Sequence, residues 1–402
     1  MKKITTILLI AFFVLDSVGQ ETVDYSELTG GLNTITTAVP FLMIAPDSRA
    51  GGMGDVGVAT TPDANSMHWN PAKLAFSEND MSISVSYVPW LRALVSDINL
   101  SYLSGYMKLD DMQAVGLELR YFSLGDITFT NLTGDKLGQY KPHELALASS
   151  YARKLTDNFS LAISGRYIYS NLTGGQAVAQ TIETSAGQSF AADIGAFYTK
   201  EIRMWGEDGN LSFGGNISNI GKKISYTSTA DADFIPINLR LGTALSTNID
   251  DYNKISFAID MNKLLVPTPP LRDVADLDND NDYNEIIAGK DPDVPVASGI
   301  FQSFFDAPGG FSEELREINY SFGSEYWYAD QFAIRAGYFF EHATKGGRKF
   351  LTFGSGVKYN AFILDFSYLI NASSDAGATN PLANTMRFSM TWDFGASADQ
   401  IN

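Results

Sequence analysis

The sequence predicts an all-β protein: a transmembrane antiparallel β-barrel of about 14 strands, closed by an N-terminal hatch that acts as a plug. Segments of about ten to thirteen residues alternate apolar with small or polar side chains from Met81 to Phe394, which is the period of a pleated strand. The connections between these segments alternate short and long. The 402 residues include 26 Phe and 19 Tyr but only 18% charged residues, and a barrel wall needs apolar side chains on every second position only.

The amino terminus predicts export. Met1-Lys2-Lys3 is basic, Ile4 to Val14 is apolar, and Ser17-Val18-Gly19 is a small-residue cleavage site that would leave Gln20 first. The chain has no cysteine, so it carries neither a lipidated thiol nor a disulfide. No later run of about 18 apolar residues follows. A membrane-inserted mature chain would therefore be a closed barrel, because closure pairs every backbone group in lipid.

The charge narrows the classes of partner. The formal net charge is −18, whereas binding to nucleic acid needs basic patches on the surface. We therefore expect no nucleic-acid partner. A soluble, β-rich secreted protein uses the same alternation of side chains and is the alternative interpretation of the pattern.

Each strand follows from its own alternating run. We expect strands at Met81–Val88, Ile98–Met107, Gln113–Leu124, Pro142–Lys154, Asn158–Ser170, Ser189–Thr199, Asn210–Asn219, Ile235–Thr247, Lys254–Asn262, Arg316–Tyr328, Gln331–Glu341, Lys349–Lys358, Phe362–Ile370 and Thr385–Phe394. Apolar sets such as Leu117, Leu119 and Tyr121 should face lipid. The charged alternates should face the lumen, because each would cost about 2–4 kcal/mol in mid-membrane. These alternates are Glu118, Arg120, Arg166, Arg240, Asp260, Glu325, Arg335 and Asp365.

Connection lengths predict the orientation. Short turns follow the even-numbered strands and long connections follow the odd-numbered ones, and such barrels keep short turns in the periplasm and long loops outside. The expected organisation is a signal peptide 1–19, a periplasmic or lumenal hatch segment 20–78, a barrel 79–396 with a long extracellular loop 263–315, and a tail 397–402.

The segment before the first strand contains two motifs. Arg49-Ala50-Gly51-Gly52-Met53-Gly54 is followed by Trp69-Asn70-Pro71-Ala72-Lys73-Leu74. Glycines permit close backbone approach, and Asn-Pro marks a turn or a helix start. These residues resemble the amino-terminal hatch of FadL-type outer-membrane proteins, and the resemblance implies a fourteen-stranded barrel behind it. It assigns to the hatch Arg49, Gly52, Gly54, Trp69, Asn70 and Pro71.

Two further motifs resemble the branch of that group that works in type IX secretion. They are Pro40 to Arg49, ahead of the hatch, and Asn262 to Pro270, after the ninth strand. The resemblance implies a component that binds the C-terminal signal domain of exported cargo. It also implies that cargo is collected from a large outer-membrane translocon barrel and delivered to a cell-surface complex that removes the signal and attaches the cargo to lipopolysaccharide.

Exposed aromatic side chains are the expected docking residues, because they desolvate when a partner binds. Phe301, Phe304, Phe305 and Phe311 surround Pro308-Gly309-Gly310 in the long loop. The first outer loop adds Trp90, Leu91 and Leu94. The alternative is that these residues fold back over the barrel mouth or belong to the aromatic belt at the membrane interface.

Two motifs of the long loop have simpler interpretations. Pro267-Thr268-Pro269-Pro270 should run extended and project the loop from the rim, since proline fixes φ. The alternative is that it only ends a strand. Asp278, Asp280 and Asp282 are weak calcium candidates, but Tyr283 and Gly289 stand where an EF-hand needs glycine and glutamate. A solvated acidic loop is the better interpretation.

No enzyme is predicted, and no cofactor. Only three histidines exist, and the GxSxG and HExxH motifs are absent. The main hypothesis is a cargo shuttle of type IX secretion. The alternative is a FadL-like transporter of hydrophobic small molecules across the outer membrane. An enzyme acting on lipopolysaccharide would need a clustered nucleophile and base, which the sequence does not reveal.

Overall fold

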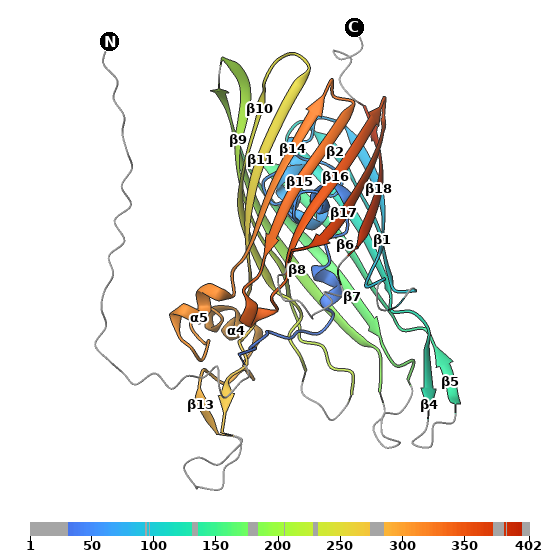
Figure 1. Ribbon diagram of the computed structural model, residues 1–402, viewed down its shortest axis with the longest axis vertical. Helices are drawn as coiled ribbons and strands as arrows, with labels where there is room; N and C mark the ends of the chain where they lie inside the picture. The colour runs from blue at the N-terminus through green and yellow to red at the C-terminus, as the bar shows by residue number, and fades with distance from the viewer. Residues whose placement is uncertain are drawn as a thin grey trace, which may run out of the picture.

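Fourteen antiparallel strands close into one barrel, in which β1 pairs with β18 through Met81 opposite Phe394 (Figure 1). This computed structural model describes residues 31–92, 95, 97–130, 136–175, 184–204, 206–227, 232–273, 285–372, 382 and 384–395. The barrel strands are β1 Met81–Pro89, β2 Asn99–Asp110, β3 Gln113–Ser123, β6 His143–Lys154, β7 Phe159–Asn171, β8 Gly187–Met204, β9 Glu207–Gly221, β10 Asn238–Asn248, β11 Asn253–Leu264, β14 Asn319–Tyr328, β15 Phe332–Phe340, β16 Lys349–Tyr359, β17 Phe362–Asn371 and β18 Met386–Phe394. The predicted fold class and strand number are confirmed. The predicted signal 1–19 and tail 397–402 lie outside the described residues.

Exposed apolar and buried polar side chains alternate along the strands of the wall, as expected for a barrel in lipid. Leu117 and Ile163 are 64% and 59% exposed on the outside, whereas Glu118 beside Leu117 is 2% exposed. All eight charged residues expected to face the lumen are buried. Period-two alternation therefore separates a hydrocarbon-facing surface from a polar interior. Among the described helices, none is long and apolar enough to cross a membrane.

The two ends of the barrel differ. Tight turns and β18's end lie at one end, and the long connections lie at the other, at the bottom of Figure 1. The long connections carry structure of their own, which the sequence did not predict. It consists of β4 Ile127–Thr130, β5 Lys136–Tyr140, β12 Leu271–Arg272, β13 Ile286–Ala288, α4 Val296–Gln302, α5 Phe311–Arg316 and the 3-10 helix η3 Ala343–Lys345.

One local prediction is wrong at the loop end. The strand expected from Arg316 begins at Asn319, because Arg316 ends α5. The proline segment follows the end of β11, where Pro267 and Thr268 are buried and the Thr268 N–H donates to Asp306 Oδ2 at 3.2 Å. The β12–β13 hairpin that comes after it extends beyond the rim (Figure 1).

The hatch runs through the lumen from end to end. Its elements are the 3-10 helices η1 Pro40–Met43 and η2 Pro71–Phe76 and the α-helices α2 Ser48–Gly51 and α3 Ser66–Trp69. At the loop end the Asn33 N–H donates to Thr344 O at 2.9 Å. At the turn end the Lys108 N–H donates to Asp80 O at 2.7 Å. The described part of the hatch therefore starts among the long loops and reaches β1 from the turn end.

The path of the hatch predicts which end of the barrel faces the outside of the cell. Because the chain has no cysteine, single introduced cysteines can test this prediction. Leu32 is 65% exposed at the loop end, and Leu155 is 51% exposed in a turn at the other end. In intact cells a membrane-impermeant maleimide should label Leu32→Cys but not Leu155→Cys, which should react only after the outer membrane is permeabilised. The reverse labelling would overturn the orientation inferred from the loop lengths.

Candidate functional site

The hatch is fixed to the barrel wall by buried charges. Arg49 Nη2 lies 2.8 Å from Glu325 Oε1 on β14, and Arg49 Nη1 lies 2.9 Å from Asp63. Glu325 also accepts from Arg335 Nε at 2.7 Å, and Arg335 pairs with Asp365 at 2.7 Å. Removing one member of such a buried network leaves charges without partners, so the hatch and the wall hold each other in place.

The other hatch residues make close backbone and amide contacts. Trp69 Nε1 donates to Asp47 Oδ1 at 2.7 Å. Asn70 Nδ2 donates to Val58 O at 3.1 Å and to Ala196 O of the wall at 2.9 Å, and Pro71 begins η2. A Cβ on Gly52 would lie 3.0 Å from the Cα of Gly354. The sequence motifs therefore come together in the lumen as a filled plug.

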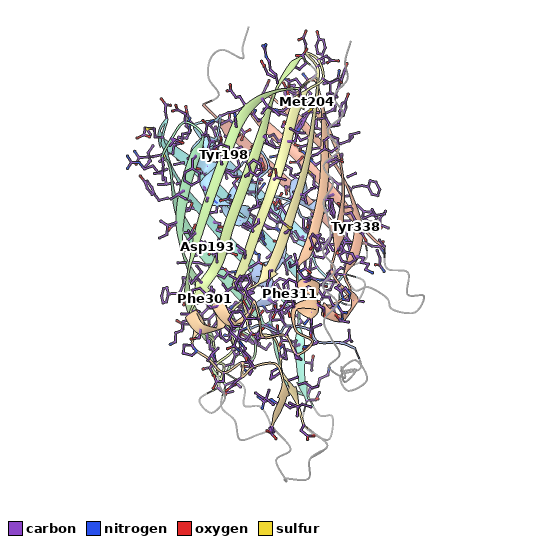
Figure 2. All side chains as sticks on the ribbon, turned by 90° about the vertical axis from the view of Figure 1, so that its left-hand side faces the viewer. Asp193, Tyr198, Met204, Phe301, Phe311 and Tyr338 are labelled. Carbon is purple, nitrogen blue, oxygen red and sulfur yellow. The ribbon has the colours of Figure 1, made fainter. Side chains whose placement is uncertain are left out.

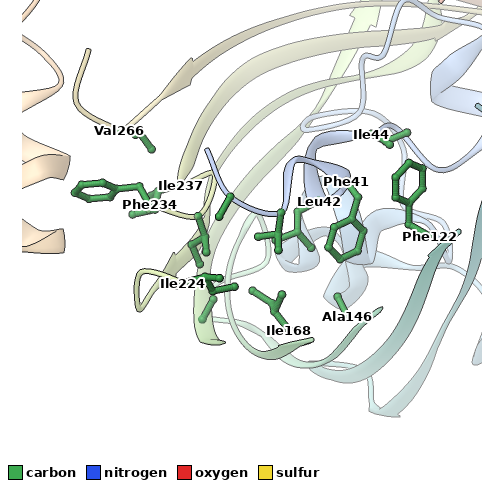
Figure 3. Packing of buried hydrophobic residues seen from close by; sticks show 14 of the residues in the cluster. Phe41, Leu42, Ile44, Phe122, Ala146, Ile168, Ile224, Phe234, Ile237 and Val266 are labelled. Atoms are coloured by element: carbon green, nitrogen blue, oxygen red, sulfur yellow. The ribbon is translucent and has the colours of Figure 1, made fainter. Parts of the chain in front are cut away.

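The long loop is folded into a cap, formed by residues 265–273 and 285–318. Val296 and Ile300 of α4 pack on an apolar cluster at the barrel mouth. Figure 3 shows that cluster, in which Phe41 of the hatch stacks on Phe122 of the wall with ring centroids 6.2 Å apart. The cap thus rests on both the hatch and the barrel.

A buried ionic cluster holds the second helix of the cap. Lys263 Nζ of β11 lies 3.0 Å from Glu314 Oε2 and 2.6 Å from Glu317 Oε2. Lys345 Nζ of η3 lies 3.0 Å from Glu317 Oε1 and 2.6 Å from Glu313 Oε1. Since Lys263 lies on β11 and Lys345 lies in the connection between β15 and β16, the cluster ties α5 to two places on the barrel rim.

This packing shifts the pKa values of two acidic residues of the cap. Burial raises the pKa of Asp306 to about 6, although the bond from the Thr268 N–H favours its carboxylate. Burial also opposes ionisation of Glu313, but the hydrogen bonds from Lys345 and Gly309 hold its pKa below the usual range. Glu313 is therefore ionised beside Lys345 over the whole physiological range of pH.

The four phenylalanines of the long loop are exposed on this cap and are together called the phenylalanine face here. Phe301 and Phe311 are 71% and 76% exposed, and Phe304 and Phe305 are also exposed. Figure 2 shows Phe301 and Phe311 at the loop end of the barrel, opposite Met204. Lys290 Nζ lies 3.9 Å from the Phe305 ring centroid. Exposed apolar patches of this kind mark interaction sites.

The first outer loop does not join this face. Trp90 and Leu91 pack against Phe339, Phe350 and Leu369 inside the barrel mouth, which is the alternative that the sequence left open. Their predicted docking role is not supported by this position. Leu94 and the calcium candidates Asp278, Asp280 and Asp282 lie outside the described residues. The part of the chain that is described contains no group of three or more residues able to hold a metal.

Sequence reasoning missed the residues that position the phenylalanine face. Lys263 and Thr268 lie in the Asn262 to Pro270 motif, but Glu317 and Lys345 belong to no motif, and the contacts among the four join segments that are far apart in the chain. One feature of the sequence could have indicated the ionic cluster. Glu314 and Glu317 are spaced so that they share one side of a short helical turn.

Three solved structures are similar to this chain at low sequence identity. The Pseudomonas putida toluene transporter TodX is 11% identical with a TM-score of 0.49, over 88% of this chain and 99% of that chain. The Ralstonia pickettii toluene transporter TbuX is 12% identical with a TM-score of 0.44, over 87% and 98%. A Pseudomonas aeruginosa FadL homologue is 12% identical with a TM-score of 0.41, over 90% and 99%.

The family comparison is more specific. No curated protein matches the chain. The family model described as Type IX secretion system protein PorV matches residues 28–271, which is more than half of the 402 residues and includes the hatch and most of the strands that surround it. The chain therefore belongs to the PorV family, outer-membrane barrel components of the type IX secretion system.

Proposed function

We propose that this protein binds the C-terminal signal domain of exported cargo at the phenylalanine face. It then carries the cargo from the large translocon barrel to the cell-surface complex that removes the signal and attaches the cargo to lipopolysaccharide. Membership of the PorV family supports the secretory setting. The location of the face at the loop end of the barrel supports binding outside the membrane, where cargo emerges.

The observation that carries this proposal is that the phenylalanine face is exposed yet rigidly mounted. Val296 and Ile300 of α4 pack on the barrel mouth, while Phe301, Phe304 and Phe305 stay exposed. Aromatic anchors dominate binding energy at protein interfaces, and anchors that are already ordered lose less entropy on docking. A loop that did not pack on the barrel mouth would lose conformational entropy each time cargo binds.

The alternative, transport of hydrophobic small molecules, is less well supported. An apolar cavity at the outer end of the lumen favours it. The hatch opposes it, because the contacts of Arg49 with Glu325 and of Asn70 with Ala196 fix the plug across the lumen. Passage would require these buried contacts to break in every transport cycle.

Replacing Phe304 and Phe305 together with aspartate should abolish cargo capture without reducing barrel assembly, because two exposed anchors that cargo would bury become charges that must stay hydrated. The measurement is affinity purification of the tagged barrel from native outer membranes, with identification of cargo signal domains and the translocon barrel. Heat-modifiable migration in gels reports assembly.

The matched control is Tyr252→Asp, which places the same charge on a 64% exposed aromatic position at the turn end of the barrel. The control should retain cargo. Unchanged cargo capture by the Phe304→Asp, Phe305→Asp variant would remove the phenylalanine face from the proposal, and recovery of free lipid alone with the unaltered protein would favour the transporter.

A further inference from the structure

Asp306 lies in the connection between α4 and α5, and its carboxyl group has few hydrogen-bond partners. The residue is only 1% exposed. Its Oδ2 accepts from the Thr268 N–H at 3.2 Å, whereas its Oδ1 is buried and has no partner among the described residues. An ionised carboxylate can accept about four hydrogen bonds, and it costs free energy when it is buried without them. The site therefore suits a neutral carboxylic acid better than a carboxylate.

Two other carboxyl groups are held beside Asp306. The N–H groups of Asp306 and Ala307 donate to Glu314 Oε1 at 2.7 and 2.9 Å. Thr268 donates its N–H to Asp306 and its hydroxyl to Glu317 Oε1 at 2.7 Å, so Glu317 lies on the same side of the cap. Burial is the main cause that raises the pKa of Asp306 to about 6, and the charges of Glu314 and Glu317 act in the same direction.

The positive groups of this region pair with other residues. Lys263 and Lys345 each form ion pairs with two of the three glutamates of the ionic cluster. Lys290 lies with its Nζ 3.9 Å from the centre of the Phe305 ring. Asp306 forms no ion pair with any residue that the structure describes. With Asp306 ionised, the cluster would contain four carboxylates and two ammonium groups, so a proton on Asp306 reduces its excess of negative charge.

We propose that Asp306 is a protonation switch of the cap: α4 and α5 pack tightly on the barrel rim when its carboxyl group is neutral and loosen when it is ionised. Phe304 and Phe305 directly precede Asp306 in the chain, so the switch controls how well the phenylalanine face is ordered. The consequence for cargo rests on the proposed function. An ordered face loses less entropy on docking, so cargo capture should strengthen as the pH falls toward 5.

The sign of the pH dependence distinguishes Asp306 from its titratable neighbours. Its pKa is about 6 in the packed cap and would return toward 3.8 in a released one, so the packed cap becomes less stable as the pH rises through this range. Burial lowers the pKa of His342, so protonation of His342 weakens the packed cap in acid. The pKa of Glu313 is held low, so its pair with Lys345 weakens only when the pH falls below 4.5. Greater stability near pH 5 than near pH 7.5 is therefore specific to Asp306 within this set.

The test is amide hydrogen exchange of the full-length barrel in a non-ionic detergent, at about pH 5 and about pH 7.5. After correction for the intrinsic pH dependence of exchange, the opening equilibrium of α4 and α5 should be about tenfold smaller at the lower pH, while the barrel strands stay unchanged. Asp306→Asn should give this strong protection at both pH values, because the amide is neutral and has nearly the same shape. Equal opening of the unaltered cap at the two pH values, or a pH dependence that persists in Asp306→Asn, would overturn the proposal.

The matched control is Asp293→Asn, which removes an aspartate of the same cap whose side chain is 73% exposed, and which should keep the pH dependence of the unaltered protein. Should Asp306→Asn fail to assemble, the sign of the pH dependence in the unaltered protein still decides. Cargo capture is measured separately at the two pH values. A pH-dependent cap that captures no cargo would contradict only the proposed function, and cargo capture by a cap whose opening ignores pH would contradict only the switch.

Discussion

Replacing Gly337 with valine is expected to expel the hatch and open the barrel to ions. Gly337 lies on β15 facing the hatch, and a Cβ there would sit 2.1 Å from the amide nitrogen of Gly54 and 2.1 Å from the carbonyl carbon of Met53. Both contacts are backbone atoms, which cannot move aside as a flexible side chain could. Gly54 has φ +72°, so the hatch cannot relax there without losing its turn.

The measurement is conductance in planar lipid bilayers. The unaltered protein should be silent, and Gly337→Val should give discrete channel openings. Gly214→Val should behave alike, since a Cβ there would lie 2.1 Å from Val58 O. Gly165→Val is the matched control, because that glycine faces outward on β7 with no heavy atom within 4 Å of a built Cβ. A silent Gly337→Val barrel would show that the hatch does not seal the lumen.

The wall of this barrel could be predicted from the sequence because strand alternation is a local property. Leu117 and Glu118 are neighbours in the chain but belong to opposite faces, and their burial follows from period two alone. The same logic placed Arg335 and Asp365 in the lumen. It could not show that these two residues pair with each other, since their contact depends on the register of β15 and β17 on either side of β16.

The cap could not be predicted because its structure depends on contacts with distant parts of the chain. The helix α4 has seven residues, too few to show an amphipathic period, and its inner side is defined only by the barrel mouth beneath Val296 and Ile300. Trp90 shows that a local pattern does not predict contacts between distant strands. Its sequence context is that of an exposed loop, yet its ring packs inward, because Phe350 and Leu369 come from strands that no local pattern connects to it.

Replacing Glu317 with leucine is expected to release the cap from the barrel rim. Glu317 is 5% exposed and accepts hydrogen bonds from Lys263, Thr268 and Lys345. Its loss leaves two buried ammonium groups short of an acceptor, which typically costs about 3–5 kcal/mol. Amide hydrogen exchange should therefore accelerate in α4 and α5, while protection of the barrel strands stays unchanged.

The control is Asp293→Leu, which removes an ion pair with Lys223 at 3.2 Å from the same cap. Asp293 is 73% exposed in its side chain, and exposed pairs contribute at most about 1 kcal/mol, so α4 should stay protected. If Glu317→Leu also leaves α4 protected, the ionic cluster does not mount the phenylalanine face. If it removes protection and weakens cargo capture together while all four phenylalanines are intact, the affinity depends on their prior ordering and not on their apolar surface alone.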